Sequence, residues 1–208
     1  YIYICDSVHI YTFLSSRKSK IGRFKKKQSK KFHEPQKKTM KRGRKNENTA
    51  SFSQRKRPDV SDAVILAYFD ACRDGNLNEV RETLRNVDNV VRMYDVSGKY
   101  GLHWAAENGH VEIVKLLIQN DHSVHVYNLM YWRALHFAAR KGHADVAKVL
   151  IQNGAYVNAV ELQKWTALHF AAWENVDIVN VLLENGANVN ALNQDEESPL
   201  HCAAEQGD

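Results

Sequence analysis

Apolar positions between residues 134 and 158 follow the period of an α-helix in two runs separated by glycine. The first run, at residues 134–140, contains two adjacent alanines that leave room for a neighbouring helix to approach closely. Gly142 interrupts it, since glycine adopts left-handed backbone angles at little steric cost. The second run, at residues 146–151, presents one apolar stripe, and the Gly154 that follows stands where a helix commonly ends. The pattern therefore predicts two antiparallel helices followed by an outward turn.

The same pattern returns along the chain at a nearly constant period. A Leu-His pair marks each copy, and its successive leucines are 33, 33 and 32 residues apart. A period of this length is typical of an array in which each unit buries its apolar face only against its neighbours. A degenerate copy precedes the others, as expected for a unit that caps the array. The leucines are Leu102, Leu135, Leu168 and Leu200, and Tyr68-Phe69 replaces Leu-His in the first copy.

These residues resemble the ankyrin repeat, whose length is 33 residues and whose signature is Thr-Pro-Leu-His-x-Ala. The resemblance extends over about residues 61–208 and includes Leu-His-x-Ala-Ala, the following Gly-His and a Gly-Ala after the second helix. It implies an all-α ankyrin-repeat solenoid of helix-turn-helix units with projecting turns. We expect a repeat domain at 59–208, with a capping repeat at 61–93, repeats at 94–126, 127–159 and 160–191, and a truncated repeat at 192–208.

Some copies depart from the family pattern at their turns. The turn glycine Gly98 has Tyr131, Lys164 and Glu196 as its counterparts, and Asp121 replaces another glycine. A residue with a side chain is strained at positive φ, although Asp and Asn are strained least. The third full repeat is also one residue short between its helices and lacks the Gly-His pair. We expect these departures to change local turn geometry and to leave the fold intact.

Histidine recurs in each copy, which raises the question of a catalytic or metal site. The recurring histidines are a whole repeat apart, and no Cys or carboxylate recurs beside them at ligand spacing. The resemblance implies instead that each imidazole hydrogen-bonds backbone in the neighbouring turn. No nucleophile–base pair, phosphate-binding glycine loop or metal cluster is recognised, so we expect no enzyme activity, no cofactor and no metal. The histidines are His103, His136, His169 and His201, with His110 and His143 between the helices.

Charge is divided unevenly along the chain. The net charge is +5, yet residues 17–58 hold 18 Lys or Arg against 2 acidic residues (+16), and residues 59–208 hold 11 against 21 (−10). A segment with few apolar residues and much charge cannot bury enough surface to fold alone, so we expect residues 1–58 to be a disordered basic tail. It is interpreted as a nuclear-localisation signal, as a solvated linker or, least favoured, as a nucleic-acid contact. The nuclear-localisation candidates are Lys25, Lys26, Lys27, Lys30, Lys31, Lys41, Arg42, Arg44, Lys45, Arg55, Lys56 and Arg57.

The cysteines and the chain ends bear on location and completeness. Cys5, Cys72 and Cys202 share no disulfide or metal spacing, which suits a reducing, intracellular compartment, cytoplasmic or nuclear. The last two fall in predicted helices, and we expect them in the core. No run reaches the length of a membrane span, so we expect no membrane partner. Because the chain opens on Tyr1 and stops within a predicted repeat, we expect a fragment of a longer protein. We also expect the chain to be a monomer.

The resemblance also implies a binding face, formed by the turn tips and the exposed side of the first helices. Trp132 and Trp165 recur one period apart at tips that should face solvent, and exposed aromatic residues flanked by charge are typical of interface hot spots. Alternatively, the two indoles stack on each other and stiffen the turns. By contrast, we expect the aromatic residue at the x of Leu-His-x-Ala-Ala to be structural. The candidate partner-binding residues are Lys99, Met130, Tyr131, Trp132, Leu162, Trp165 and Trp173, and the structural ones are Trp104, Phe137 and Phe170.

Three functional hypotheses follow from these observations. The first is a non-catalytic scaffold that holds a protein partner on its concave face as a preformed platform. The second is the regulatory segment of a larger multidomain enzyme, channel or toxin. The third is a nuclear protein that associates with nucleic acid through its basic tail. The resemblance further implies that Asn158 and Asn190, in the Val-Asn step after each Gly-Ala turn, are substrates of an asparaginyl hydroxylase.

Overall fold

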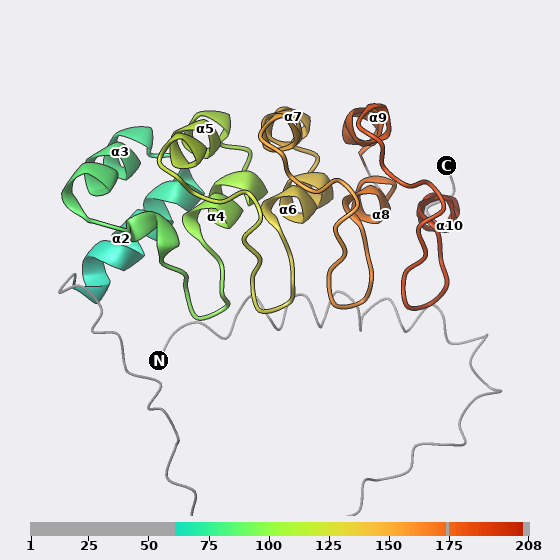
Figure 1. Ribbon diagram of the computed structural model, residues 1–208, viewed down its shortest axis with the longest axis horizontal. Helices are drawn as coiled ribbons and strands as arrows, with labels where there is room; N and C mark the ends of the chain where they lie inside the picture. The colour runs from blue at the N-terminus through green and yellow to red at the C-terminus, as the bar shows by residue number, and fades with distance from the viewer. Residues whose placement is uncertain (1–60, 174, 206–208) are drawn as a thin grey trace, which may run out of the picture. The chain divides into compact units, whose positions relative to one another are not determined.

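The computed structural model describes residues 61–173 and 175–205, which form a row of helix pairs (Figure 1). Each pair consists of an inner and an outer helix, and the expected all-α ankyrin-repeat solenoid is confirmed. The expected basic tail and its nuclear-localisation candidates lie outside the described residues. The inner helices are α2 (Asp62–Asp74), α4 (Gly101–Glu107), α6 (Ala134–Lys141), α8 (Ala167–Ala171) and α10 (Pro199–Ala204), and the outer ones are α3 (Leu77–Asn86), α5 (Val111–Gln119), α7 (Ala144–Gln152) and α9 (Val176–Glu184), with a 3-10 turn η1 (Val90–Arg92).

The helices pack in two layers. Each inner helix packs on the next inner helix, from α2 to α10, and each outer helix packs on the next outer helix, from α3 to α9 (Figure 1). The repeated leucines at 102, 135 and 168 are buried between the layers, and the repeated alanines of the inner helices are buried beside them. Cys72 and Cys202 are buried as well, which confirms their expected place in the core. Each unit thus completes its core with its neighbours.

Between helix pairs the chain projects as a hairpin, and the hairpins extend on one side of the inner helices (Figure 1). Gly98 lies at the turn of the first hairpin with φ 77°. Its counterparts Tyr131, Lys164 and Glu196 adopt φ of 61°, 62° and 61°, so they keep the left-handed conformation of the glycine that they replace. A left-handed backbone costs a residue with a side chain about 1 kcal/mol or more. The hairpins close through isolated β-bridges, Tyr94 to Tyr100, Tyr127 to Arg133 and Val160 to Thr166.

One side chain at the start of each hairpin holds its turn. Its oxygen accepts two backbone N–H groups, from the residues two and four positions later, and satisfies donors that the turn would otherwise leave unpaired. In the second hairpin, Asn128 Oδ1 accepts from Met130 and Trp132, both at 2.9 Å. These residues carry different side chains in different repeats, so the repeat pattern alone does not reveal them. They are Asp95, Asn128, Glu161 and Asn193.

The recurring histidines connect each repeat to the next. In all four of them Nδ1 accepts a backbone N–H at the start of the inner helix, which places the ring proton on Nε2. In three of them Nε2 donates this proton to a carbonyl in the following turn, which confirms the expected structural role for these three. The Nε2–O distances are 3.2 Å from His103 to Val126, 2.9 Å from His136 to Ala159 and 3.1 Å from His169 to Glu197.

The histidines between the two helices of a repeat hydrogen-bond to the backbone of the preceding repeat. His110 Nε2 lies 2.8 Å from the Arg73 carbonyl, and His143 Nε2 lies 3.0 Å from the Glu107 carbonyl. In the short third repeat Asn175 stands at this position, and its amide reaches the carbonyl of Ala139 at 3.4 Å. The departure from the family pattern therefore alters one contact and keeps the connection between repeats.

Candidate protein-interaction surface

Aromatic side chains from successive hairpins and inner helices meet in the angle between these two elements, on the concave face. The Phe170 ring centroid lies 4.4 Å from that of Trp132 and 5.2 Å from that of Trp165. Phe170 therefore lies between the two indoles, and the alternative that they stack on each other is wrong. The ring centroids of Trp165 and Trp173 lie 6.3 Å apart, and those of Trp132 and Phe137 lie 5.1 Å apart. We call the set the aromatic row: Trp104, Trp132, Phe137, Trp165, Phe170 and Trp173.

Lys99 connects Trp104 to the rest of the aromatic row. Its ammonium lies 3.8 Å from the Trp104 ring centroid, 5.0 Å from that of Phe137 and 2.8 Å from Glu107 Oε2. Lys99 is only 6% exposed, so the expectation of an open tip position is wrong for this residue. The hairpin folds its side chain inward because an indole face and a carboxylate together attract a cation.

Trp132 is 7% exposed, which also contradicts the expected solvent-facing position. The rings of Phe137 and Phe170 pack against it, and the Arg140 guanidinium lies 5.6 Å from its centroid. Its side chain also hydrogen-bonds Glu161, whose pKa is raised by burial and lowered in part by its hydrogen bonds. The indole is buried because the next repeat supplies a ring that covers it.

The other aromatic residues divide as follows. Phe137 is fully buried, as expected for a structural residue, and Trp104 and Phe170 are partly buried against the core. Trp165 and Trp173 are half-buried, so part of each indole is open on the concave face. Met130 and Leu162 are exposed at the hairpin tips. Of the candidate residues, Trp165, Trp173, Met130, Leu162 and Tyr131 therefore have the exposure that a binding surface requires.

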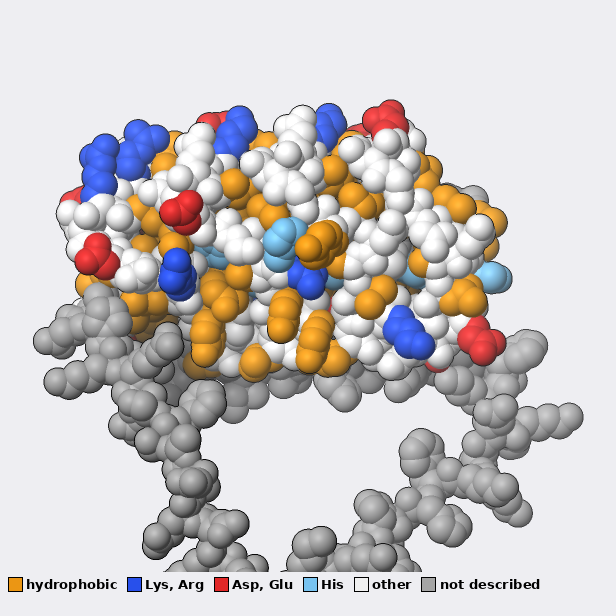
Figure 2. Space-filling view, in the orientation of Figure 1, with side chains coloured by type: hydrophobic (Ala, Val, Ile, Leu, Met, Phe, Trp, Pro, Cys, Tyr) orange, Lys and Arg blue, Asp and Glu red, His pale blue; other side chains and the backbone are white. Residues whose placement is uncertain are grey.

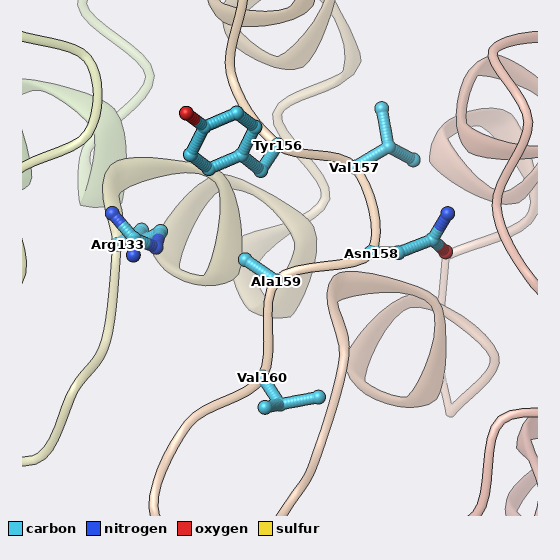
Figure 3. Close-up of a pocket in the computed structure, with 6 residues that line it drawn as sticks. All are labelled: Arg133, Tyr156, Val157, Asn158, Ala159 and Val160. Atoms are coloured by element: carbon cyan, nitrogen blue, oxygen red, sulfur yellow. The ribbon is translucent and has the colours of Figure 1, made fainter.

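Tyr131 does not join the aromatic row. Its ring is half exposed and stacks on Tyr127 at 5.0 Å with an interplanar angle of 5°. Arg133 lies between Tyr127 and Tyr156, 5.4 and 5.7 Å from their centroids. Figure 2 shows hydrophobic side chains gathered over the hairpins in this view. In Figure 3, Arg133 and Tyr156 line a shallow pocket with Val157, Asn158, Ala159 and Val160.

The surface formed by Tyr127, Tyr131, Arg133 and Tyr156 has a signal in the sequence. Tyr94 and Tyr127 are one 33-residue period apart, and a tyrosine that recurs at one exposed position is as visible as the recurring tryptophans. Because side chains alternate between the two sides of an extended hairpin, Tyr131 and Trp132 are placed on different surfaces. The expectation that both residues belong to one binding face is therefore wrong.

The hairpin tips are joined to one another. Backbone N–H groups donate to the preceding hairpin at three steps, which gives the concave face a continuous, preformed edge. The residues proposed for hydroxylation lie elsewhere: Asn158 donates to the Gly186 carbonyl at 2.9 Å, while Asn190 is exposed, and their modification stays a prediction. The three steps are Leu129 to Ser97 at 3.2 Å, Leu162 to Met130 at 3.4 Å and Gln194 to Gln163 at 2.9 Å.

Over residues 61–173 and 175–205, no group of three or more His, Cys, Asp or Glu side chains could hold a metal ion. Within the same part of the chain, no helix is long and apolar enough to cross a membrane. The buried thiols of Cys72 and Cys202 have pKa values raised to about 12, chiefly by burial, which disfavours the reactive thiolate.

Comparison with known families identifies the repeats. A family model described as ankyrin repeats (3 copies) matches residues 68–161, 102–193 and 159–208, which together span more than half of the chain. The chain belongs to the ankyrin-repeat family. Ankyrin repeats form a protein-interaction domain, and this agrees with the open indoles of the concave face.

Known relatives share only short stretches with this ankyrin-repeat chain. Acyl-CoA-binding domain-containing protein 6 of Rattus norvegicus is 39% identical over 51 residues, 24% of this chain and 18% of the relative. The protein of the same name from Homo sapiens is 35% identical over 52 residues, 25% of this chain and 18% of the relative. Palmitoyltransferase AKR1 of Lachancea kluyveri is 33% identical over 70 residues, 33% of this chain and 10% of the relative. The matched segments therefore cover less than a fifth of these relatives.

Proposed function

We propose that this chain is a non-catalytic scaffold that holds a protein partner on its concave face. The observation that supports this most is the aromatic row, which is buried over Trp132 and Phe137 and opens to solvent at Trp165 and Trp173. Large aromatic side chains that are anchored by packing yet partly accessible carry much of the binding energy in protein interfaces. The partner therefore contacts the indoles of the third full repeat first.

The rest of the concave face is suited to bind without rearrangement. The hairpins are held by their own Asp, Asn or Glu side chains, by tip-to-tip backbone hydrogen bonds and by the repeated histidines. A platform fixed in this way loses little conformational entropy on binding. The exposed Met130 and Leu162 at the tips add apolar area at the margin of the site.

Site-specific photo-crosslinking tests the proposal. A photoreactive phenylalanine derivative at Trp173 should crosslink the partner in cells, and the same group at Lys148, exposed on outer helix α7, should not. The additional substitution W165A should abolish the crosslink from position 173. Equal crosslinking from both positions, or crosslinking only from Lys148, would show that the partner binds elsewhere.

A second candidate function is the regulatory segment of a larger enzyme. It is supported by the similarity to palmitoyltransferase AKR1, of which the matched segment covers only 10%. The complete reading frame decides between the two functions: a catalytic domain in the same chain supports regulation, and repeats without such a domain support a scaffold.

A further inference from the structure

Three positions of each repeat build the concave face, and their side chains change from one repeat to the next. One position is in the hairpin, one in the middle of the inner helix and one at its end. The first full repeat carries a cation, an indole and a carboxylate, the third is wholly aromatic, and the fourth carries two carboxylates. In this order the residues are Lys99, Trp104 and Glu107; Trp132, Phe137 and Arg140; Trp165, Phe170 and Trp173; and Glu197, Cys202 and Glu205.

The first full repeat shows what such a combination of side chains binds. The Lys99 ammonium lies against the Trp104 ring, 3.8 Å from its centroid, and 2.8 Å from Glu107 Oε2. The indole receives a second polar contact from Asp95 Oδ2, which accepts the Trp104 Nε1–H at 3.1 Å. The chain thus already contains a site in which an indole face and a carboxylate hold one cation.

Each hairpin residue also reaches forward to the middle of the next inner helix. Lys99 lies 5.0 Å from the Phe137 centroid, and Trp132 lies 4.4 Å from that of Phe170. The next residue in this series is Trp165, and the position of α10 that corresponds to Phe137 and Phe170 holds Cys202, which is much smaller than phenylalanine. Trp165 is consequently half-buried, whereas Trp132 is 7% exposed.

The repeat that follows Trp165 carries two carboxylates, one at each end of α10. Glu197 precedes α10 and Glu205 follows it, and both act electrostatically on the buried Cys202 thiol between them, adding to the rise in its pKa that burial causes. The Glu197 carbonyl accepts from His169 at 3.1 Å, which fixes this hairpin against the third full repeat. Asn193 Nδ2 donates to Glu197 Oε2 at 2.9 Å and orients the carboxylate.

We propose that Trp165, Glu197 and Glu205 form a binding site for a Lys or Arg side chain of a basic, extended peptide segment in a partner protein. The aliphatic stem of that side chain lies along the Trp165 indole, and its charged end reaches the two carboxylates. The arrangement repeats the Lys99 site, with the cation supplied by the partner. Residues 59–208 carry a net charge of −10, which favours a basic partner over an acidic one. This inference rests on the proposed function and specifies its partner.

An unbiased selection tests the chemistry of the partner. A displayed library of random 12-residue peptides is depleted on the full-length W165A chain and then selected on the full-length wild-type chain. Depletion removes peptides that bind other parts of the chain. Recovered sequences should be enriched in Lys and Arg. Recovered sequences that are neutral or acidic would overturn the proposed cation site while leaving concave-face binding intact, and failure to recover any sequence would overturn both.

Two conservative substitutions provide a second measurement that does not depend on removing an indole. The full-length variant E197Q/E205Q keeps the size of both side chains, and circular dichroism should show an unchanged fold. The Kd of a fluorescein-labelled recovered peptide, measured by anisotropy, should rise about tenfold or more, and less at high salt. The matched control E112Q, on the exposed face of outer helix α5, should leave the Kd unchanged. An unchanged Kd in E197Q/E205Q would overturn the proposal.

Discussion

The buried histidines make the stability of the array dependent on pH in a predictable direction. Burial lowers the pKa of His103 from 6.5 to about 3 and that of His136 from 6.5 to about 4. In both rings Nδ1 already accepts a backbone N–H, so a second ring proton would break that hydrogen bond. The pKa of His169 is lowered for the same reason. We therefore expect the folded array to resist protonation at these three positions.

The size of the effect follows from linkage between protonation and folding. Because the folded pKa lies below the unfolded one, the unfolded chain takes up protons first as the pH falls. The stabilisation is complete above pH 6.5 and is lost progressively towards the folded pKa. Between pH 7.0 and pH 5.0, His103 and His136 should each lower the free energy of unfolding by about 2 kcal/mol. Glu161 acts in the opposite direction, because burial raises the pKa of its carboxyl.

Urea unfolding at the two pH values measures this effect. In the wild type, the free energy of unfolding differs between pH 7.0 and pH 5.0, and this difference should be smaller by about 2 kcal/mol in H136Q. Glu161 contributes equally in both proteins, so its effect cancels in the comparison. H201Q, at an exposed position of the same series, should keep the wild-type difference. If H136Q is too unstable to measure, NMR titration of the wild-type imidazole Cε1–H signals replaces it. Buried rings that titrate near pH 6.5 would refute the reasoning.

The remaining predictions concern the aromatic row, the hairpin turns and the basic segment. W132A should lower the free energy of unfolding by about 3–5 kcal/mol because the indole is buried. W165A should lower it by roughly 1–2 kcal/mol and weaken partner binding by about 2 kcal/mol, because this indole is partly exposed. Chemical denaturation and binding titrations measure these effects. K164G should raise the free energy of unfolding by up to about 1 kcal/mol, since Lys164 has φ 62°, while K148G within α7 should lower it by about 1 kcal/mol. Deleting residues 17–58 should abolish nuclear accumulation of a reporter fusion. It should also remove the salt dependence of DNA binding, in which the logarithm of the affinity falls with the logarithm of the salt concentration by about 0.9 per neutralised phosphate. Unchanged localisation and binding would show that this segment is a linker.

The sequence alone determined the features that repeat. Because every unit uses the same positions for its core, a pattern read in one copy also describes what its neighbours offer. The 33-residue period therefore predicted the helix pairs, the burial of Leu102, Leu135 and Leu168 and the backbone bonds of three histidines, whereas Leu200 in the last described helix is 76% exposed. The left-handed turns at Tyr131, Lys164 and Glu196 also followed from their alignment with Gly98.

Only the tertiary structure decided the exposure of the side chains that do not repeat. Trp132 and Trp165 occupy the same position in their repeats, yet Phe170 covers the first, while the next repeat holds the smaller Cys202 at the position that corresponds to Phe170. Lys99 shares that position as well, and it turns inward because Trp104 and Glu107 attract its charge. The exposure of a residue on the concave face depends on which residue the next repeat places against it. That contact joins positions about 38 residues apart, beyond the reach of any local pattern.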